Sequence, residues 1–349
     1  LYKVDENHNA IELLFCPVSN VGDSEHKVVV PNTVVKVADN AFKDNVGIEQ
    51  IIFEDNAEGS NRDIVIGSNV FYVSIDSTLE KIVLPEGMTT ISSDMFMWAR
   101  AKEIVVPSTV ATIQKGGFRY SYAEKITFTA GNVGTPLIIE SGVATGYGIG
   151  QDGAFYGAYK LKEIVLPERT ESIGDYAFYS NAPTALTKVV IPSTVKTIGN
   201  NAFNNAKSLE TVVITDTTEN KSKLTDIGEK AFYYNQKLMT INLPESLITI
   251  GKDAFYKTSI VEVFIPSNVT SIGVEAFAYS PALTKVTFGK DSQLTEIAQS
   301  VFYDCKKLTA IGTIKSVTKD GVSKDEFVEG AMPSGLTTVG ESAFRFAKI

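Results

Sequence analysis

The sequence predicts a repeat solenoid of about twelve short rungs. An Ala-Phe pair, or a close relative of it, recurs along the whole chain, and in eight copies a proline stands eleven residues before the phenylalanine. Most of these phenylalanines are 22 to 29 residues apart, and the two longer gaps, of 37 and 42 residues, contain insertions. Rungs are numbered here by their phenylalanines: Phe42, Phe71, Phe96, Phe118, Phe155, Phe178, Phe203, Phe232, Phe255, Phe277, Phe302 and Phe344.

Each part of a rung has a structural interpretation. The sixth rung runs through Ile164, Leu166, Pro167, Ile173, Gly174, Ala177 and Phe178. The alternation of Ile164 and Leu166 predicts a short strand, which the proline ends because it has no amide hydrogen to donate. A second short inward segment is expected at Ile173, a tight bend at Gly174, and a small and a large core residue in the Ala-Phe pair. One rung cannot bury these residues alone, so stacking is required.

The repeated string L-x-x-I-x-I-P-x-x-V-x-x-I-G-x-x-A-F resembles the leucine-rich repeats of the BspA family over residues 26–347. The resemblance implies a leucine-rich-repeat, right-handed, β-rich superhelix with parallel strands on its concave face. It also implies a secreted or cell-surface bacterial protein, often one segment of a longer chain. The family often has cysteine three residues after the phenylalanine. Here only Cys305 fits, and the position otherwise holds small residues such as Asn45, Ser121, Asn181, Asn235 and Ser280.

The chain divides into two predicted parts. Residues 1–25 are expected to form an N-terminal capping hairpin, and residues 26–349 the repeat array, with insertions at 129–153 and 315–332. Rungs 2, 5, 8 and 11 lack the proline and have longer polar turns, which supports the hypothesis that a block of three rungs was duplicated. The last rung has no recognisable polar cap, and we expect a further domain beyond Ile349.

Composition excludes several classes of partner. The net charge of −9 and pI near 5.0 argue against nucleic acid, because its phosphates favour basic surfaces. No segment is long and apolar enough to span a membrane. Cys16 and Cys305 lie near opposite ends of the chain, so we expect both to be buried, unbonded side chains.

Two columns of residues should face outward from the strands. The first alternates in charge from Lys81 to Lys188, which neutralises it and favours a structural role. The second column is apolar. This has two explanations: branched side chains are favoured in strands, or the column forms a groove for a protein partner. The candidate partner-binding residues are Val83, Val105, Val165, Val190, Val213 and Phe264, together with Tyr147 in the first insertion.

Aromatic residues also recur one or two positions after the core phenylalanine and predict a stripe away from the strands. The stripe consists of Tyr72, Trp98, Tyr120, Tyr156, Tyr179, Tyr233, Tyr234, Tyr256, Tyr279 and Tyr303. Such side chains can stack on sugars, but half-buried packing explains them better.

Nothing in the sequence indicates catalysis, a cofactor or a metal site. The two histidines, His8 and His26, precede the first complete rung, and neither a zinc-ligand cluster nor a phosphate-binding loop is recognisable. Together with the resemblance, this absence predicts a non-catalytic interaction scaffold. The resemblance implies adhesion or contact with a host or bacterial protein, through the concave face or the inserted loops. The alternatives are a glycan-binding module that uses exposed aromatics and a passive spacer in a longer surface protein.

Overall fold

The computed structural model describes residues 1–16, 26–55, 64–67, 69–72, 78–131, 134–143, 152–180, 184–319 and 322–349. These residues form β-strands and turns, and none of them is helical. They make two compact units. Unit 1 contains Leu1–Thr170 and Tyr176–Leu186, and unit 2 contains Glu171–Asp175 and Thr187–Ile349. Each unit is a β-solenoid built of parallel strands, which confirms the predicted fold class.

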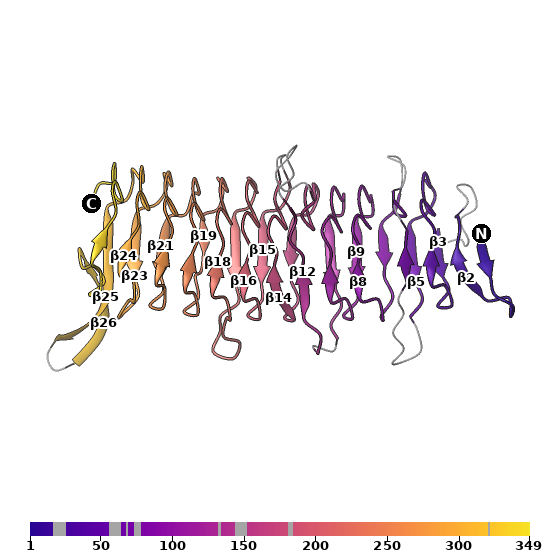
Figure 1. The fold of residues 1–349 in the computed structure, drawn as a ribbon, viewed down its shortest axis with the longest axis horizontal. Coiled ribbons are helices and arrows are strands. Elements are labelled where there is room, and N and C mark those ends of the chain that lie inside the picture. Colours follow the sequence, from indigo (N-terminus) through magenta and orange to yellow (C-terminus); the bar gives the residue numbers. More distant parts are fainter. Residues whose placement is uncertain are drawn as a thin grey trace. The chain divides into compact units, whose positions relative to one another are not determined.

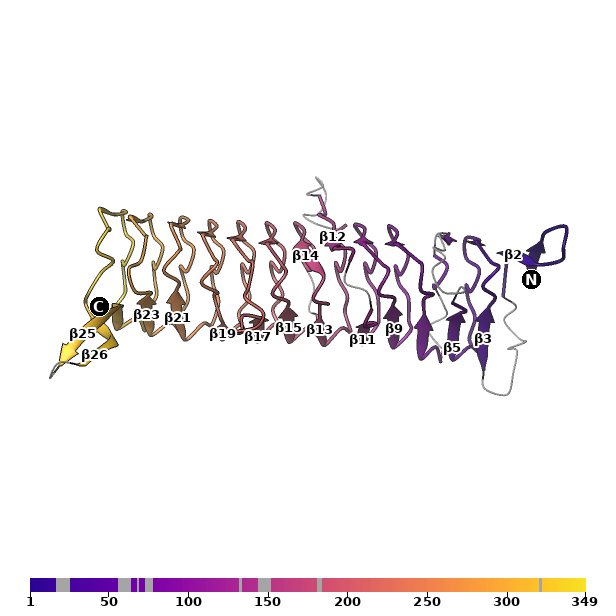
Figure 2. The same ribbon diagram turned by 90° about the horizontal axis from the view of Figure 1, so that it is seen from below.

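Every complete rung has two strands. The first is called the long strand because it mostly has three or four residues, and the second the short strand because it mostly has two. Unit 1 shows this arrangement in Figures 1 and 2. Its long strands are β3 (Lys27–Val30), β5 (Gln50–Phe53), β7 (Lys81–Val83), β9 (Glu103–Val106), β11 (Lys125–Phe128) and β13 (Glu163–Val165). Its short strands are β4 (Lys36–Val37), β6 (Val65–Ile66), β8 (Thr90–Ile91), β10 (Thr112–Ile113) and β12 (Leu137–Ile139). The long strands β3 to β11 pair in parallel, each with the next rung, and so form one five-stranded sheet.

Unit 2 repeats the pattern. Its long strands are β15 (Lys188–Ile191), β17 (Thr211–Ile214), β19 (Thr240–Ile241), β21 (Glu262–Ile265), β23 (Lys285–Phe288) and β25 (Ala310–Lys319). Its short strands are β14 (Thr170–Ile173), β16 (Thr197–Ile198), β18 (Asp226–Ile227), β20 (Thr249–Ile250), β22 (Ser271–Ile272), β24 (Glu296–Ile297) and β27 (Thr338–Val339). The second short inward segment predicted for each rung is therefore present.

The core of each unit is a column of stacked phenylalanine rings. In unit 1 the rings of Phe96 and Phe118 are 4.9 Å apart and nearly parallel, and in unit 2 those of Phe232 and Phe255 are 5.3 Å apart. Burying one such ring stabilises the fold by roughly 1.5–3 kcal/mol, and the neighbouring rung supplies the contact. The position three residues after the ring is buried too, with Asn45, Ser121, Asn235, Ser280 and Cys305 all 0–1% exposed. Asn181 lies outside the described residues.

The glycine that follows the short strand is needed for a reason other than the bend that we expected at Gly174. Its counterparts Gly228 and Gly251 do not have a positive φ. A Cβ at Gly251 would instead lie 2.5 Å from the carbonyl carbon of Gly228 in the preceding rung. The glycine thus permits two rungs to approach closely. The left-handed residues of a rung stand before its alanine and two positions after its phenylalanine, as Asp253 (φ 54°) and Lys257 (φ 55°) do in rung 9.

The N-terminal segment forms the hairpin that the sequence predicts. Strands β1 (Tyr2–Val4) and β2 (Ala10–Leu13) pair antiparallel, and β2 pairs in parallel with β4. In the turn, the Asp5 carboxylate accepts backbone hydrogen bonds from Asn7 and Asn9, both 2.9 Å long. The hairpin thus extends the sheet of the short strands β4 and β6. A boundary at residue 25 stays a prediction, since residues 17–25 lie outside the described part.

The two insertions differ from their prediction in detail. Residues 129–153 do not form a single loop, because Leu137–Ile139 within them is β12, the short strand of rung 5, paired with β10. The candidate Tyr147 lies outside the described residues. Residues 315–332 contribute to an antiparallel hairpin of β25 with β26 (Val322–Glu329), with β25 also paired to β23.

The turns without proline occupy one place in the rung. They follow the long strands β5, β11, β17 and β23. In unit 2, the Lys223 amide donates to the Ser193 carbonyl oxygen (2.7 Å), and the Gln293 amide donates to that of Ser267 (2.9 Å). Both acceptors directly follow the proline of the preceding rung, so the turns of rungs 8 and 11 dock alike. This equivalence is what the hypothesis of a duplicated three-rung block predicts.

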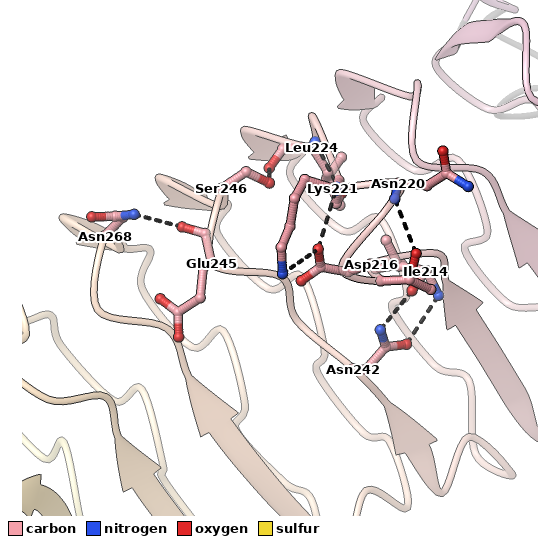
Figure 3. Close-up of polar contacts among 11 residues, drawn as sticks. Ile214, Asp216, Asn220, Lys221, Leu224, Asn242, Glu245, Ser246 and Asn268 are labelled. Atoms are coloured by element: carbon pink, nitrogen blue, oxygen red, sulfur yellow. Dashed lines mark hydrogen bonds and ion pairs between the residues drawn. The ribbon is translucent and has the colours of Figure 1, made fainter.

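Figure 3 shows the turn of rung 8 and its neighbours. Asp216 accepts a hydrogen bond from the Ser222 amide (3.2 Å) and lies 3.6 Å from the Lys221 amine. Where β19 ends, the Asn242 side-chain amide continues the ladder: it accepts from the Ile214 amide (2.9 Å) and donates to the Ile214 carbonyl oxygen (2.6 Å). These polar groups therefore bond to the protein itself, which indicates a structural role.

Candidate binding cleft on the strand face of unit 1

A cleft opens on the long-strand face of unit 1 where its five-stranded sheet ends. The sheet ends at β11, and the next long strand, β13, is not a member of it. Between the two strands lies a cleft of about 590 Å³. Its lining residues are Glu124, Lys125, Ile126, Thr127, Phe128, Lys162, Glu163, Val165 and Pro167.

Phe128 shows how the end of the sheet changes the surface. It is the last residue of β11 and is half-buried. Residues at the same position of other long strands belong to the core, since Phe53 is 2% exposed and Phe288 is 0% exposed. Val165, on the opposite wall, is 54% exposed. The cleft is thus lined by an apolar aromatic ring and an exposed aliphatic side chain, and it is large enough for a partner's side chain.

Charged side chains of both signs surround this apolar surface. On one side, Lys162 Nζ lies 3.0 Å from Glu124 Oε2. On the other, the Glu103 carboxylate receives Lys125 at 3.1 Å and Lys81 at 3.5 Å, and the Thr127 hydroxyl donates to it (2.9 Å). These ion pairs confirm that opposite charges meet across the rungs from Lys81 to Lys125. The charged side chains of the rim therefore pair with one another. Contact with them should orient a partner more than it adds to the binding affinity.

The pKa values of the two rim carboxylates follow from these contacts. Burial raises the pKa of Glu103, but hydrogen bonds from Lys125 and Thr127 and the charge of Lys81 outweigh it, so the pKa lies below its usual range. The hydrogen bond from Lys162 lowers the pKa of Glu124. Both carboxylates are therefore ionised at neutral pH, and the rim retains its pairs there.

The predicted partner-binding residues do not all gather at this cleft. Val165 lines it, whereas Val83 on β7 and Val105 on β9 are half-buried in the same unit. In unit 2, Val190 on β15 is half-buried, Val213 on β17 is 37% exposed and Phe264 on β21 is 41% exposed. The apolar column is thus real but uneven, and Val165 is its most exposed member among these residues.

Sequence reasoning missed Phe128, Ile126 and the Glu124–Lys162 ion pair. The signal in the sequence was indirect: rung 5 lacks its proline and has a long turn after β11. Sheet pairing depends on where the backbone of the next rung lies, which the local repeat pattern does not reveal. Phe128 therefore resembled an ordinary core residue of its strand.

The aromatic residues after the core phenylalanines form a ring stack in each unit. In unit 1, Trp98 stacks on Tyr120 with centroids 4.4 Å apart, and in unit 2 Tyr233 stacks on Tyr256 at 4.9 Å. Burial raises the pKa of the Tyr256 hydroxyl well above its ordinary value. Most members are half-buried, as expected for rings packed on one side with a wet hydroxyl.

Groups for other chemistry are sparse in the described ranges. His8 and His26 are both exposed, and His26 Nδ1 lies 3.2 Å from Glu49 Oε1. Cys16 and Cys305 are buried and free, as predicted. Within these ranges, no group of three histidine, cysteine or acidic residues is placed to hold a metal ion. No helix that could cross a membrane is found there either.

Comparisons with known proteins agree with this architecture. The model of a family described as BspA type leucine rich repeat region matches residues 22–135, 149–221 and 215–323, in six copies. A leucine-rich repeat protein from Bacteroides ovatus shares 20% identity at a TM-score of 0.51, covering 96% of this chain and 72% of that one.

Two further solved structures align at lower TM-scores. A leucine rich repeat protein of T. pallidum is 26% identical, with 51% of this chain and 73% of that chain covered at a TM-score of 0.41. A leucine rich cell surface protein from Faecalibacterium prausnitzii is 20% identical, with 84% and 89% covered at a TM-score of 0.36. No curated protein matches the chain.

Proposed function

Because this chain belongs to the BspA type leucine rich repeat family, we propose that it is a non-catalytic interaction scaffold that binds a protein partner through the strand face of unit 1. The cleft between β11 and β13 accepts an apolar side chain of the partner. Phe128 carries this proposal. The rings of its counterparts Phe53 and Phe288 are buried in the core, whereas the ring of Phe128 lines a cleft.

The composition of the cleft supports a protein as the partner. Interface energy concentrates in a few apolar anchors that fill pockets, surrounded by polar groups that exclude water. Phe128 and Val165 supply such a pocket, and the ion pair of Glu124 with Lys162 lies on its rim. The rim carries both signs of charge, so a strongly charged ligand gains little there.

The location of the protein is part of the same proposal. The resemblance to this family implies a surface location, so we propose that this chain lies on the cell surface or outside the cell, where it meets host or bacterial proteins in adhesion. Family membership alone supports this location. The passive-spacer alternative requires that the strand face bind nothing.

The test uses three valine-to-glutamate variants of the purified chain. Val165→Glu places a charge in the cleft, Val213→Glu makes the same change at the same strand position in unit 2, and Val65→Glu makes it on the short strand β6, where Val65 is 61% exposed. Each variant and the wild type are titrated against a panel of extracellular matrix proteins and against peptides selected on the wild type from a random library. Thermal melts establish that each variant is folded.

We expect Val165→Glu to weaken binding at least about tenfold, the loss typical of a disrupted anchor pocket, and Val65→Glu to have no effect. Equal losses of affinity in Val165→Glu and Val213→Glu would show that the partner binds the apolar column as a whole and not the cleft alone. If all three folded variants bind as the wild type does, the strand face is not the binding surface. Absence of binding by the wild type would favour the spacer.

A further inference from the structure

A second cavity of unit 1 lies beside the turns that follow the core phenylalanines. Its volume is about 510 Å³, and its lining comes from rungs 1 to 4. The lining residues are Asn40, Lys43, Asn69, Tyr72, Met97, Trp98, Arg100 and Tyr122. None of them lines the strand-face cleft, so this cavity is a separate place on the unit.

The aromatic part of the cavity is held rigidly. Trp98 is the single tryptophan of the chain, and its indole stacks on the Tyr120 ring of rung 4 at 4.4 Å and 16°. Tyr120 stacks in turn on Tyr159 at 6.0 Å. One face of the indole is thus covered by Tyr120. Trp98 also lines the cavity, together with residues of the earlier rungs such as Tyr72, which is 39% exposed. A fixed, flat ring of this kind suits the C–H face of a sugar ring and loses little entropy on binding.

The polar part of the cavity is cationic. The Arg100 guanidinium lies 4.3 Å above the Tyr122 ring, which fixes the plane of its hydrogen-bond donors. Lys43 is exposed on another part of the lining, Asn40 and Asn69 supply amides, and none of the eight lining residues is acidic. A planar guanidinium matches a carboxylate with two parallel hydrogen bonds. The chain as a whole has a net charge of −9, so the basic lining of this cavity does not follow from a general excess of basic residues.

We propose that this cavity binds a sugar that carries a carboxylate. The sugar ring stacks on Trp98, its carboxylate binds Arg100 with Lys43 nearby, and its hydroxyls bind the amides of Asn40 and Asn69. Neutral sugars lack the charged contact, and acidic peptides lack a ring face for the indole. The inference does not depend on the strand-face cleft and goes beyond the protein-binding function.

The tryptophan itself reports the test. Because Trp98 is the only tryptophan of the chain, its fluorescence emission monitors this cavity and no other site. The intact chain is titrated with a galacturonate oligomer and with a sialylated trisaccharide, which represent the two sources of an acidic sugar. Two matched probes separate the contributions. Lactose has a sugar ring but no charge, and an oligoglutamate peptide has carboxylates but no sugar ring. We expect a saturable change in emission with at least one acidic sugar, and binding at least about tenfold weaker for both matched probes.

Two variants test the named contact. Arg100→Met retains the length of the side chain but removes the charge. Arg345→Met removes another arginine that lies over an aromatic ring, 4.9 Å above Phe346 in unit 2. Arg100→Met should weaken binding of the acidic sugar at least about tenfold, and Arg345→Met should leave it unchanged. Lys43→Met provides a second test should Arg100→Met fail to fold, and it should also weaken binding.

The outcomes are decisive in both directions. No change in Trp98 emission with either acidic sugar overturns the proposal. Equal affinity for lactose overturns the role of the carboxylate, and equal affinity for oligoglutamate overturns that of the sugar ring. If folded Arg100→Met and Lys43→Met bind the acidic sugar with wild-type affinity, the charged contact does not exist and the proposed site is overturned.

Discussion

Arg169 Nη2 donates a hydrogen bond to the carbonyl oxygen of Pro107, 3.5 Å away and 62 residues earlier in the sequence. Its Nη1 donates to the carbonyl oxygen of Val110. Pro107 belongs to rung 4 and Arg169 to rung 6, so the side chain spans rung 5, which lacks a proline turn of its own. The backbone of Arg169 also accepts a hydrogen bond from the Leu137 amide of rung 5 (2.8 Å). One buried arginine thus joins three rungs where the regular turn is missing.

Replacing Arg169 by methionine should destabilise unit 1. Arg169 is 7% exposed, and burial lowers the pKa of its guanidinium. Its removal leaves the Val110 carbonyl oxygen without this donor, while the Pro107 carbonyl oxygen keeps its hydrogen bond from the Val110 amide. The loss should cost about 1–3 kcal/mol. Trp98 lies in unit 1 and reports its unfolding in urea. Lys102→Met, at an exposed lysine paired with Glu80 in the same unit, should change stability by less than about 0.5 kcal/mol. A comparably small effect of Arg169→Met would show that the bridge is dispensable.

Adding one methyl group at Gly251 should destabilise unit 2. The Cβ of alanine would lie 2.5 Å from the Gly228 carbonyl carbon and 2.6 Å from the Glu229 nitrogen, both of them backbone atoms. The rungs must move apart, at a cost of about 1–3 kcal/mol. At Gly335 the nearest atom would be 4.0 Å away, so Gly335→Ala should be neutral or stabilise by up to about 1 kcal/mol. Thermal melts of the two variants measure the contrast, and equal midpoints would refute the close-approach explanation.

Both thiols should be unreactive in the folded protein. Cys305 is 0% exposed, its Sγ lies 3.2 Å from the Phe277 carbonyl oxygen, and burial raises its pKa to about 12. Burial also raises the pKa of Cys16. We expect Ellman's reagent at pH 8 to modify neither cysteine until urea unfolds the chain. Reaction of the native protein on mixing would contradict the burial of the thiols.

The raised pKa of Cys305 also makes a prediction for alkaline stability. The stability that comes from burying the neutral thiol is fully present below the ordinary thiol pKa of 9.0. It is lost as pH rises from 9.0 toward about 12, because the unfolded chain ionises first. Cys305→Ser should therefore lose less stability than the wild type between these pH values, measured by urea unfolding. A parallel decline in the two proteins would assign the loss to other groups.

The repeated rung could be predicted because its determinants are local. Ile164 and Leu166 alternate, Pro167 ends their strand, and Phe178 needs a neighbouring ring to be buried, so the sequence pattern and the stacking agree. The hairpin around Asp5 followed from the same local reasoning. What could be predicted of the candidate site was limited to Val165, an outward position on a predicted strand.

The rest depends on how one rung lies against the next. Phe128 could not be distinguished from Phe53 by its neighbours in sequence, since the difference comes from the end of the sheet at β11. Leu137–Ile139 was assigned to an insertion because the turn before it hides the period of the repeat. The reach of Arg169 over rung 5 is likewise invisible in sequence, because it joins residues that are 59 and 62 positions apart.

The position two residues after the core phenylalanine has the same left-handed backbone in several rungs that carry very different side chains there. Its φ is 60° at Trp98, 59° at Tyr234, 55° at Lys257 and 57° at Asp304. An indole, a phenol, an amine and a carboxylate are thus displayed from one rigid scaffold, and the rung accepts the local strain of each. Random substitution at these positions would generate a library of surfaces on an unchanged core, so the turn is a natural point from which to engineer new recognition.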